Sequence, residues 1–309
     1  MPSKLFLFLT VNGRANHEQL MSVLPALSVL SHVVMRRGVV QTLILICVTI
    51  TFLLCSSRYN HLNPTCQEKC VSRFSSDSEG CEIVDDDQKI VSFSVWGELR
   101  RIYRRGVTEN AELVRRVFPG WRMRLHVIRD MEQSMVEAVC QLKCEQDDMI
   151  DLCLVTDDLT GLGDIWRFLP VLDTRVSVII SRDLDSRVSI REAEAVRDWL
   201  ENTELTLHVM RDHPQHAADI LAGLWGARIN NVTTILRHQM RQLFTAAGTH
   251  FSGDQWFKGL DQYLLSQWIV PLMKNHTCVH DSYHCHHYQW PHWRPFPTKR
   301  LVDTNYIFD

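Results

Sequence analysis

Short runs rich in aliphatic and β-branched residues alternate with amphipathic stretches along most of the chain beyond residue 89. Strands that alternate with helices usually form a sheet with helices on its faces, because each connection carries the chain back across the sheet. The sequence therefore predicts an α/β domain built on a single mixed sheet. The predicted strands cover residues 90–95, 122–128, 150–155, 176–180 and 205–210.

Two helices are specified by clear local signals. Ser189 and Glu192 have the spacing of a capping box, and apolar residues then recur on one helical face. A second helix is predicted over residues 260–270, where Pro271 should end it. The first of these helices directly follows the segment Asp183-Leu184-Asp185.

An apolar run at residues 39–55 contains no charged side chain and has the length of a short membrane-spanning helix. Arg36 and Arg37 immediately precede it, whereas only Arg58 follows closely, so the N-terminus is predicted to be cytosolic. A cleaved signal peptide is the alternative, but the positive pair lies deep in the chain and no small-residue cleavage site follows the run.

These signals predict a single-pass type II membrane protein of the secretory pathway, with its C-terminal part in the lumen, most simply of the Golgi. Residues 1–38 are the expected cytosolic tail, 39–55 the signal anchor and 56–88 a lumenal stem rich in Ser, Asp, Cys and Asn. Residues 89–309 are the expected folded domain. The formal charge of -3 argues against a nucleic-acid partner.

The cysteines agree with a lumenal location, since eight of them lie beyond the apolar run and can pair in an oxidising compartment. Asn231 and Asn275 open glycosylation sequons on the same side. Cys278 and Cys285 are expected to form a disulfide rather than to join the nearby histidines in a zinc site. The pairing of the remaining cysteines stays open.

A pair of acidic residues follows the apolar strand predicted at residues 176–180. Asp183 and Asp185 stand just beyond its carboxyl end, which is the edge of an α/β sheet where ligands bind. Two carboxylates there can hold Mn²⁺ or Mg²⁺, and the ion can offset charge on a departing diphosphate. The alternative is an ordinary turn whose acids are solvated and precede the next helix.

Several motifs, taken together, resemble a little-characterised group of glycosyltransferase-like proteins with a nucleotide-diphospho-sugar transferase (GT-A) fold. The resemblance extends from about residue 89 to the C-terminus and is more specific than the Asp-x-Asp pair alone. Its motifs are SRDLDSR at 181–187, MRDHPQH at 210–216, GLWG at 223–226, GLDQ at 259–262 and VHDS at 279–282.

This resemblance implies a metal site formed by Asp183, Asp185 and His280, with Mn²⁺ or Mg²⁺ as the ion and a nucleotide-sugar as the donor. It also places the loop after the first strand near the nucleotide. The other residues implied to contact the donor are Ser94, Trp96, Gly97, Arg182, Arg211 and Gln262.

Two further carboxylates are candidates for catalysis. Asp212 follows a predicted strand, where it could act as a base or belong to a hydrogen-bonded turn. Asp261 opens a predicted helix, where an acid also favours the helix dipole, and the resemblance implies a contact with donor or acceptor.

The leading hypothesis is metal-dependent transfer of a sugar from a nucleotide-sugar to a glycan, protein or lipid acceptor. A phosphoryl hydrolase of the haloacid-dehalogenase type is an alternative, with Asp183 as the nucleophile, although Arg187 replaces the expected Thr or Val. A non-catalytic glycan-binding protein with the same fold is the third hypothesis.

Overall fold

A computed structural model describes residues 46–47, 49–50, 64–76, 80–81, 86–97, 100–146, 149–156, 159–229, 234–250 and 257–300. The chain divides into two units, residues 1–61 and 62–309. The predicted anchor at 39–55 falls in the first unit and lies outside the described residues, apart from residues 46, 47, 49 and 50. Among the described residues, no helix has the length and hydropathy needed to cross a membrane.

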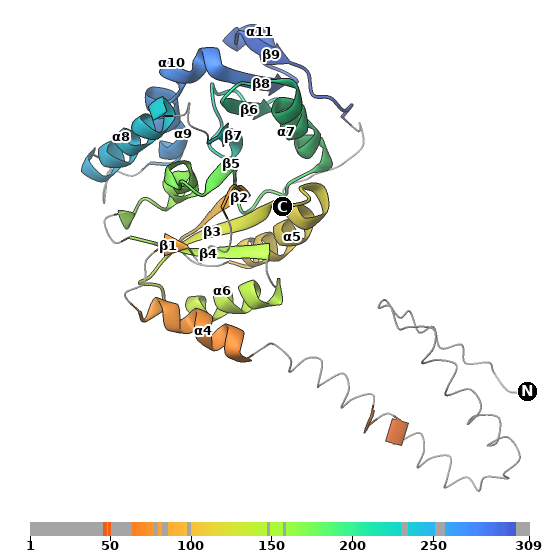
Figure 1. Ribbon diagram of the computed structural model, residues 1–309, viewed down its shortest axis with the longest axis vertical. Helices are drawn as coiled ribbons and strands as arrows, with labels where there is room; N and C mark the ends of the chain where they lie inside the picture. Colours follow the sequence, from red (N-terminus) through yellow and green to blue (C-terminus); the bar gives the residue numbers. More distant parts are fainter. Residues whose placement is uncertain are drawn as a thin grey trace, which may run out of the picture. The chain divides into compact units, whose positions relative to one another are not determined.

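The second unit contains one nine-stranded sheet in the order β1-β4-β3-β2-β5-β7-β6-β8-β9, which can be followed in Figure 1. Its strands are β1 Gly80–Cys81, β2 Gln88–Val95, β3 Arg122–Ile128, β4 Ile150–Val155, β5 Val176–Arg182, β6 Leu207–Arg211, β7 Leu224–Arg228, β8 Thr277–Asp281 and β9 His292–Arg294. The predicted α/β class and all five predicted strands are confirmed.

The directions of the strands make the sheet mixed. Strands β4, β3, β2 and β5 are parallel, and so are β6, β8 and β9. Strand β7 runs antiparallel to both of its neighbours, β5 and β6, so the two parallel groups point the same way. The carboxyl ends of β2, β5, β6 and β8 therefore share one edge of the sheet.

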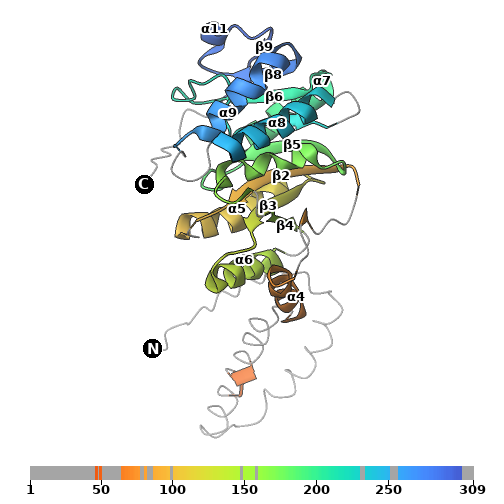
Figure 2. The same ribbon diagram turned by 90° about the vertical axis from the view of Figure 1, so that its left-hand side faces the viewer.

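Helices cover both faces of this sheet, and each face has its own apolar core. Figure 1 shows α8 and α9 on one side of strands β5 to β8 and α7 on the other, and Figure 2 shows α8 and α9 in front. The helices are α4 Pro64–Phe74, α5 Arg101–Val117, α6 Gln133–Glu145, α7 Ile190–Asn202, α8 Thr234–His250, α9 Leu260–Trp268, α10 Val270–Met273 and α11 Cys285–Tyr288, with 3₁₀ helices η4 Gly163–Leu172 and η6 Lys274–His276.

The capping box that the sequence predicts is present at the start of α7, where the Ser189 side chain accepts from Glu192 N–H and the Glu192 side chain accepts in return. The second predicted helix is shorter than expected. It ends at Trp268, and Pro271 lies in the first turn of α10, where a missing N–H costs no helical hydrogen bond.

Three disulfides join the N-terminal part of the second unit to the rest of that unit. Cys66–Cys144 and Cys70–Cys140 join α4 to α6, and Cys81–Cys153 joins β1 to β4. Helix α4 and strand β1 lie within the residues expected to form a stem, yet they are folded with the domain. The folded unit therefore begins before the boundary predicted at residue 89.

The expected disulfide between Cys278 and Cys285 is wrong, because Cys278 has a free thiol. Strand β8 turns this side chain into the core, where it is fully buried, whereas Cys285 begins α11 beyond the strand. Of the two sequons, Asn275 is exposed and Asn231 lies outside the described residues.

Candidate active site

The carboxyl ends of β2 and β5 are neighbours, and η4 packs against both strands near that edge. Ser94, near the end of β2, accepts a 2.9 Å hydrogen bond from the backbone N–H of Arg167 in η4. This contact sets the position of η4 relative to the sheet. It also fixes the backbone from which the Arg167 side chain extends.

The Arg167 side chain joins two carboxylates that are distant in sequence. Its Nη1 lies 2.5 Å from Asp183 Oδ1, and its Nη2 lies 2.6 Å from Asp261 Oδ2. The guanidinium is 9% exposed, Asp261 is 13% exposed and Asp183 is 48% exposed, so the group opens to solvent on the Asp183 side. We call Ser94, Arg167, Asp183 and Asp261 the Arg167 cluster.

The two carboxylates of this cluster differ in acidity. Burial opposes ionisation of Asp183, but the guanidiniums of Arg167 and Arg182 outweigh it and lower its pKa. Burial raises the pKa of Asp261, and the negative charge of Asp183 raises it too. Arg167 lowers this pKa but does not cancel the rise. Carboxylates whose pKa values are pushed apart can take different roles in one site.

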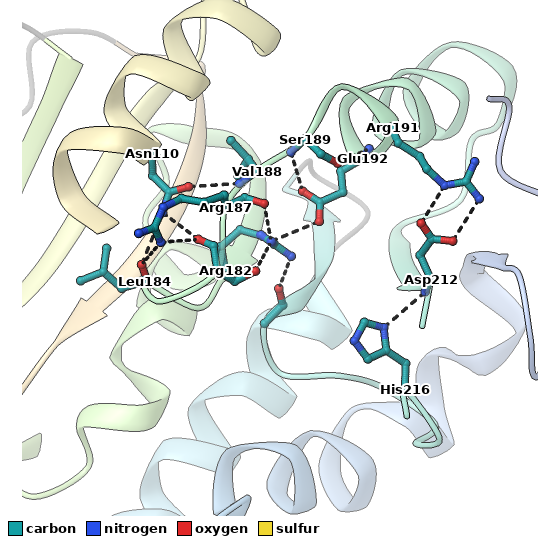
Figure 3. Close-up of polar contacts among 12 residues, drawn as sticks. Asn110, Arg182, Leu184, Arg187, Val188, Ser189, Arg191, Glu192, Asp212 and His216 are labelled. Atoms are coloured by element: carbon teal, nitrogen blue, oxygen red, sulfur yellow. Dashed lines mark hydrogen bonds and ion pairs between the residues drawn. The ribbon is translucent and has the colours of Figure 1, made fainter. Parts of the chain in front are cut away.

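The loop that contains Asp183 and Asp185 is held by Asn110 of α5 (Figure 3). Asn110 Nδ2 donates to the Ser186 carbonyl at 2.8 Å, and its Oδ1 accepts from the Val188 N–H at 3.1 Å. A fully buried amide with both ends bonded fixes the loop backbone. The predicted Asp-x-Asp turn is therefore rigidly placed.

Arg182, expected to contact a donor, is instead used within the protein (Figure 3). It is 2% exposed, and it donates to the Gly223 carbonyl at 2.9 Å and to Ser186 Oγ at 2.9 Å. Its Nη2 also lies 3.1 Å from Glu192 Oε1. Arg182 thus ties β5 to the start of β7 and to α7.

Two glycines allow the loop to pack this closely. A Cβ at Gly106 would lie 2.1 Å from the Leu184 carbonyl oxygen, and one at Gly223 would lie 2.0 Å from Asp183 Oδ2. Neither position has room for a side chain. The second glycine belongs to the GLWG motif and directly borders the Asp183 carboxylate.

The remaining residues expected near the donor lie around this edge. Trp96 is 45% exposed and packs so closely on Gly163 of η4 that a Cβ there would lie 2.2 Å from the indole Cγ. Gly97 follows it with φ of +67°, which favours glycine. Asp185 is exposed in the turn after β5, and the Gln262 N–H donates to Asp261 Oδ1 at 2.8 Å.

Asp212 and Arg211 belong to a different group of contacts, at the end of β6. Arg191 binds the Asp212 carboxylate through two hydrogen bonds of 2.7 and 3.0 Å (Figure 3), and Ser282 Oγ donates to it at 2.6 Å. Burial opposes ionisation of Asp212, but these hydrogen bonds outweigh it and lower the pKa. Arg211 is fully buried and pairs with Asp281 at 2.7 Å. Both residues are engaged in internal contacts.

His280 is not brought to the two aspartates. It lies in β8, and β7 and β6 separate that strand from β5, a spacing of about 14 Å at 4.8 Å per strand. Its ring is fully buried, with Nδ1 2.7 Å from His208 Nε2 and Nε2 3.0 Å from Asp198 Oδ2. Burial lowers the pKa of His280 to about 4.

The sequence interpretation left out Arg167, which is the centre of the cluster. Its partners are 16 and 94 residues away, so no local motif contains the contact. One signal was present: Arg167 stands between Trp166 and Phe168 in the run Ile165 to Leu169, whose other residues are all apolar. A guanidinium in such a segment needs a buried acidic partner.

A scan against protein-family models finds no match for this chain, and a search of curated proteins finds no relative.

Proposed function

We propose that the protein transfers a sugar from a nucleotide-sugar donor to a glycan, protein or lipid acceptor, with a divalent cation at Asp183 and Asp185. The observation that carries this proposal is the Arg167 cluster at the carboxyl edge of β2 and β5. Ligands of α/β sheets bind at that edge. The mixed sheet with helices on both faces is compatible with the GT-A fold that the motifs resemble.

The aspartates suit a hard cation such as Mn²⁺ or Mg²⁺. Both present carboxylate oxygens after the same strand, Asp185 is exposed, and half of the Asp183 side chain is accessible. His280 has no part in this proposal because of its position in β8. The ion would supply positive charge to offset the charge on the departing diphosphate.

The protein residues have separate tasks in this reaction. The bond between the sugar and the diphosphate breaks, its electron pair leaves on the diphosphate, and the sugar forms a new bond to an acceptor oxygen. Asp261 accepts the proton that the acceptor hydroxyl loses, a role helped by its raised pKa. Arg167 holds Asp183 and Asp261 in fixed positions, and the exposed Trp96 offers a flat surface for the nucleotide.

The three disulfides indicate an extracellular or lumenal domain. We propose a Golgi membrane location with the anchor at residues 39–55, which a protease-protection assay on sealed microsomes can check. A C-terminal epitope that is digested without detergent would contradict that topology.

The decisive experiment is a thermal-shift series on the purified chain with nucleotide-sugars, with and without Mn²⁺, on the wild type and on Asp183→Asn. We expect a Mn²⁺-dependent rise in melting temperature for the wild type that the variant loses. Asp87→Asn, which changes an exposed acid just before β2, at the opposite edge of the sheet, is the matched control. An unchanged Mn²⁺-dependent shift in Asp183→Asn would refute the metal assignment, and a phosphoryl-enzyme formed on Asp183 would favour the hydrolase.

A further inference from the structure

A second group of potential ligands lies in the core beneath α7, away from the Arg167 cluster. Strands β6 and β8 are parallel, with His208 opposite Cys278 and Met210 opposite His280. Side chains alternate along a strand, so these four residues all point to the same face of the sheet. Two imidazoles, a thiol and a thioether therefore share one face.

The ligand atoms of three of these residues are close together. His208 Nε2 lies 2.7 Å from His280 Nδ1, and Cys278 Sγ lies 4.0 Å from that same nitrogen. All three side chains are fully buried, and Met210 is 1% exposed. In the part of the chain that the structure describes, this is the one group of three His, Cys, Asp or Glu side chains compact enough to share an ion.

Neighbouring residues hold both imidazole rings in position. Asp198 Oδ2 accepts from His280 Nε2 at 3.0 Å, so the unprotonated Nδ1 of that ring faces His208 and Cys278. Arg294 in turn lies 2.5 Å from Asp198 Oδ2. The indole of Trp199 stacks on the His208 ring at 5.0 Å. A carboxylate behind a histidine is a common support for a metal ligand.

We propose that His208, Cys278 and His280 form a binding site for copper, with the Met210 thioether as a further, weaker ligand. Two histidines, a cysteine and a methionine are a donor set that copper favours in proteins. Binding needs a small expansion of the site. Two nitrogens at about 2.0–2.1 Å from one ion stand about 3.3 Å apart, so the two rings must separate by about 0.6 Å.

Charge and ligand type favour Cu⁺ over Zn²⁺ here. Cys278 has to lose its thiol proton to bind, and the resulting thiolate neutralises Cu⁺ but leaves one net positive charge with Zn²⁺. A net charge in a buried site is costly, and the charge of Asp198 is already offset by Arg294. Thioethers are also ligands for soft ions such as Cu⁺ rather than for zinc.

This site does not depend on the proposed sugar transfer, because none of its residues belongs to the Arg167 cluster and β7 separates β6 and β8 from β5. It can be tested on the full-length chain by competition for Cu⁺ with a chromophoric chelator, with ascorbate to keep copper reduced. We expect the wild type to retain one Cu⁺ per chain. Cys278→Ser should lose it, and Asp198→Asn should weaken binding by about 10–100-fold.

Two matched variants separate this site from the histidine-rich segment that follows β8. Cys285→Ser and His287→Gln change the same residue types outside the proposed site and should retain copper. Three results would overturn the proposal. They are loss of copper from either control as from Cys278→Ser, transfer of all copper from the wild type to the chelator, and displacement of Cu⁺ by Zn²⁺ at equal concentration.

X-ray absorption on the copper-loaded wild type does not depend on whether any variant folds. The proposed site requires sulfur and two imidazole nitrogens around the ion. A spectrum with nitrogen and oxygen neighbours alone would also overturn the proposal.

Discussion

Replacing Arg167 by Met tests how much the Arg167 cluster depends on its guanidinium. Methionine keeps the apolar stem of the side chain out to the position of Nε but removes the charged end of the guanidinium that Asp183 and Asp261 share. Any loss then comes from two carboxylates left without their cation. A cavity contributes little to such a change.

The magnitude follows from the exposure of the two partners. Asp261 is 13% exposed, and a largely buried carboxylate that loses its partner costs about 3–5 kcal/mol. Asp183 is 48% exposed, so water replaces the guanidinium there and its share is at most about 1 kcal/mol. Asp261 keeps some contact with water and with the Gln262 N–H. We therefore expect Arg167→Met to lower the free energy of unfolding by about 3 kcal/mol, the lower end of that range.

The loss should depend on pH in a defined direction. Burial and the neighbouring Asp183 already raise the pKa of Asp261 in the folded protein, and removal of Arg167 raises it further. A carboxyl whose folded pKa is raised binds more protons when folded, so stability falls as the pH rises from the unfolded value towards the folded one. Arg167→Met should therefore lose more stability at pH 7 than at pH 4.

The free energy of unfolding, from denaturant titrations at both pH values, measures this effect. Arg197→Met is the matched control, because Arg197 pairs with Glu194 on the exposed surface of α7 and should contribute at most about 0.5 kcal/mol. Adding Asp261→Asn to Arg167→Met should restore part of the loss. Equal effects for the two arginines, or a larger loss at pH 4, would refute the reasoning.

Two other features make further predictions. Gly223→Ala places a methyl 2.0 Å from Asp183 Oδ2, so it should abolish Mn²⁺-dependent donor binding in a thermal-shift assay. Gly248→Ala in α8 meets no atom within 4 Å, so it should raise the free energy of unfolding by about 0.5–1 kcal/mol. Bridges Cys66–Cys144 and Cys70–Cys140 close nearly the same loop. Removing one by a pair of serines should therefore cost only about 2 kcal/mol in denaturant titrations, and a loss of about 4 kcal/mol, as for a single bridge, would contradict this.

The elements that the sequence predicts correctly are those with a local signal. Strand β5 is an apolar run, and α7 begins with a capping box that needs only Ser189 and Glu192. Strand β7 has five residues and a central glycine, Gly226, so it has neither the length nor the composition of a typical strand. The sequence therefore indicates only the GLWG motif there and not the strand that separates β5 from β6.

The candidate site could be predicted only in part, for a related reason. The position of Asp183 follows from the strand before it, but its connection to Asp261 through Arg167 depends on where α9 packs, 78 residues later. That Asp183 and Asp261 share a guanidinium is a property of the packed structure. No spacing along the chain contains it.

The misplacement of His280 has a more specific cause. The VHDS motif ends β8, and the carboxyl ends of β8 and β5 do lie at one edge of the sheet. Being at the same edge is not sufficient, because His280 precedes the end of its strand and its side chain points into the core beneath α7. The strand order then adds about 14 Å between the two strands.

The two carboxylates predicted to be catalytic, Asp212 and Asp261, have pKa values shifted in opposite directions. Their contacts decide which of them is better suited to accept a proton. Asp212 is bound by Arg191 and Ser282, and its lowered pKa leaves it little tendency to accept a proton. Asp261 shares one guanidinium with Asp183 and has a raised pKa. Of the two acids predicted to be catalytic, Asp261 is the one whose surroundings favour proton transfer, and it is also the one beside the open Asp183 carboxylate.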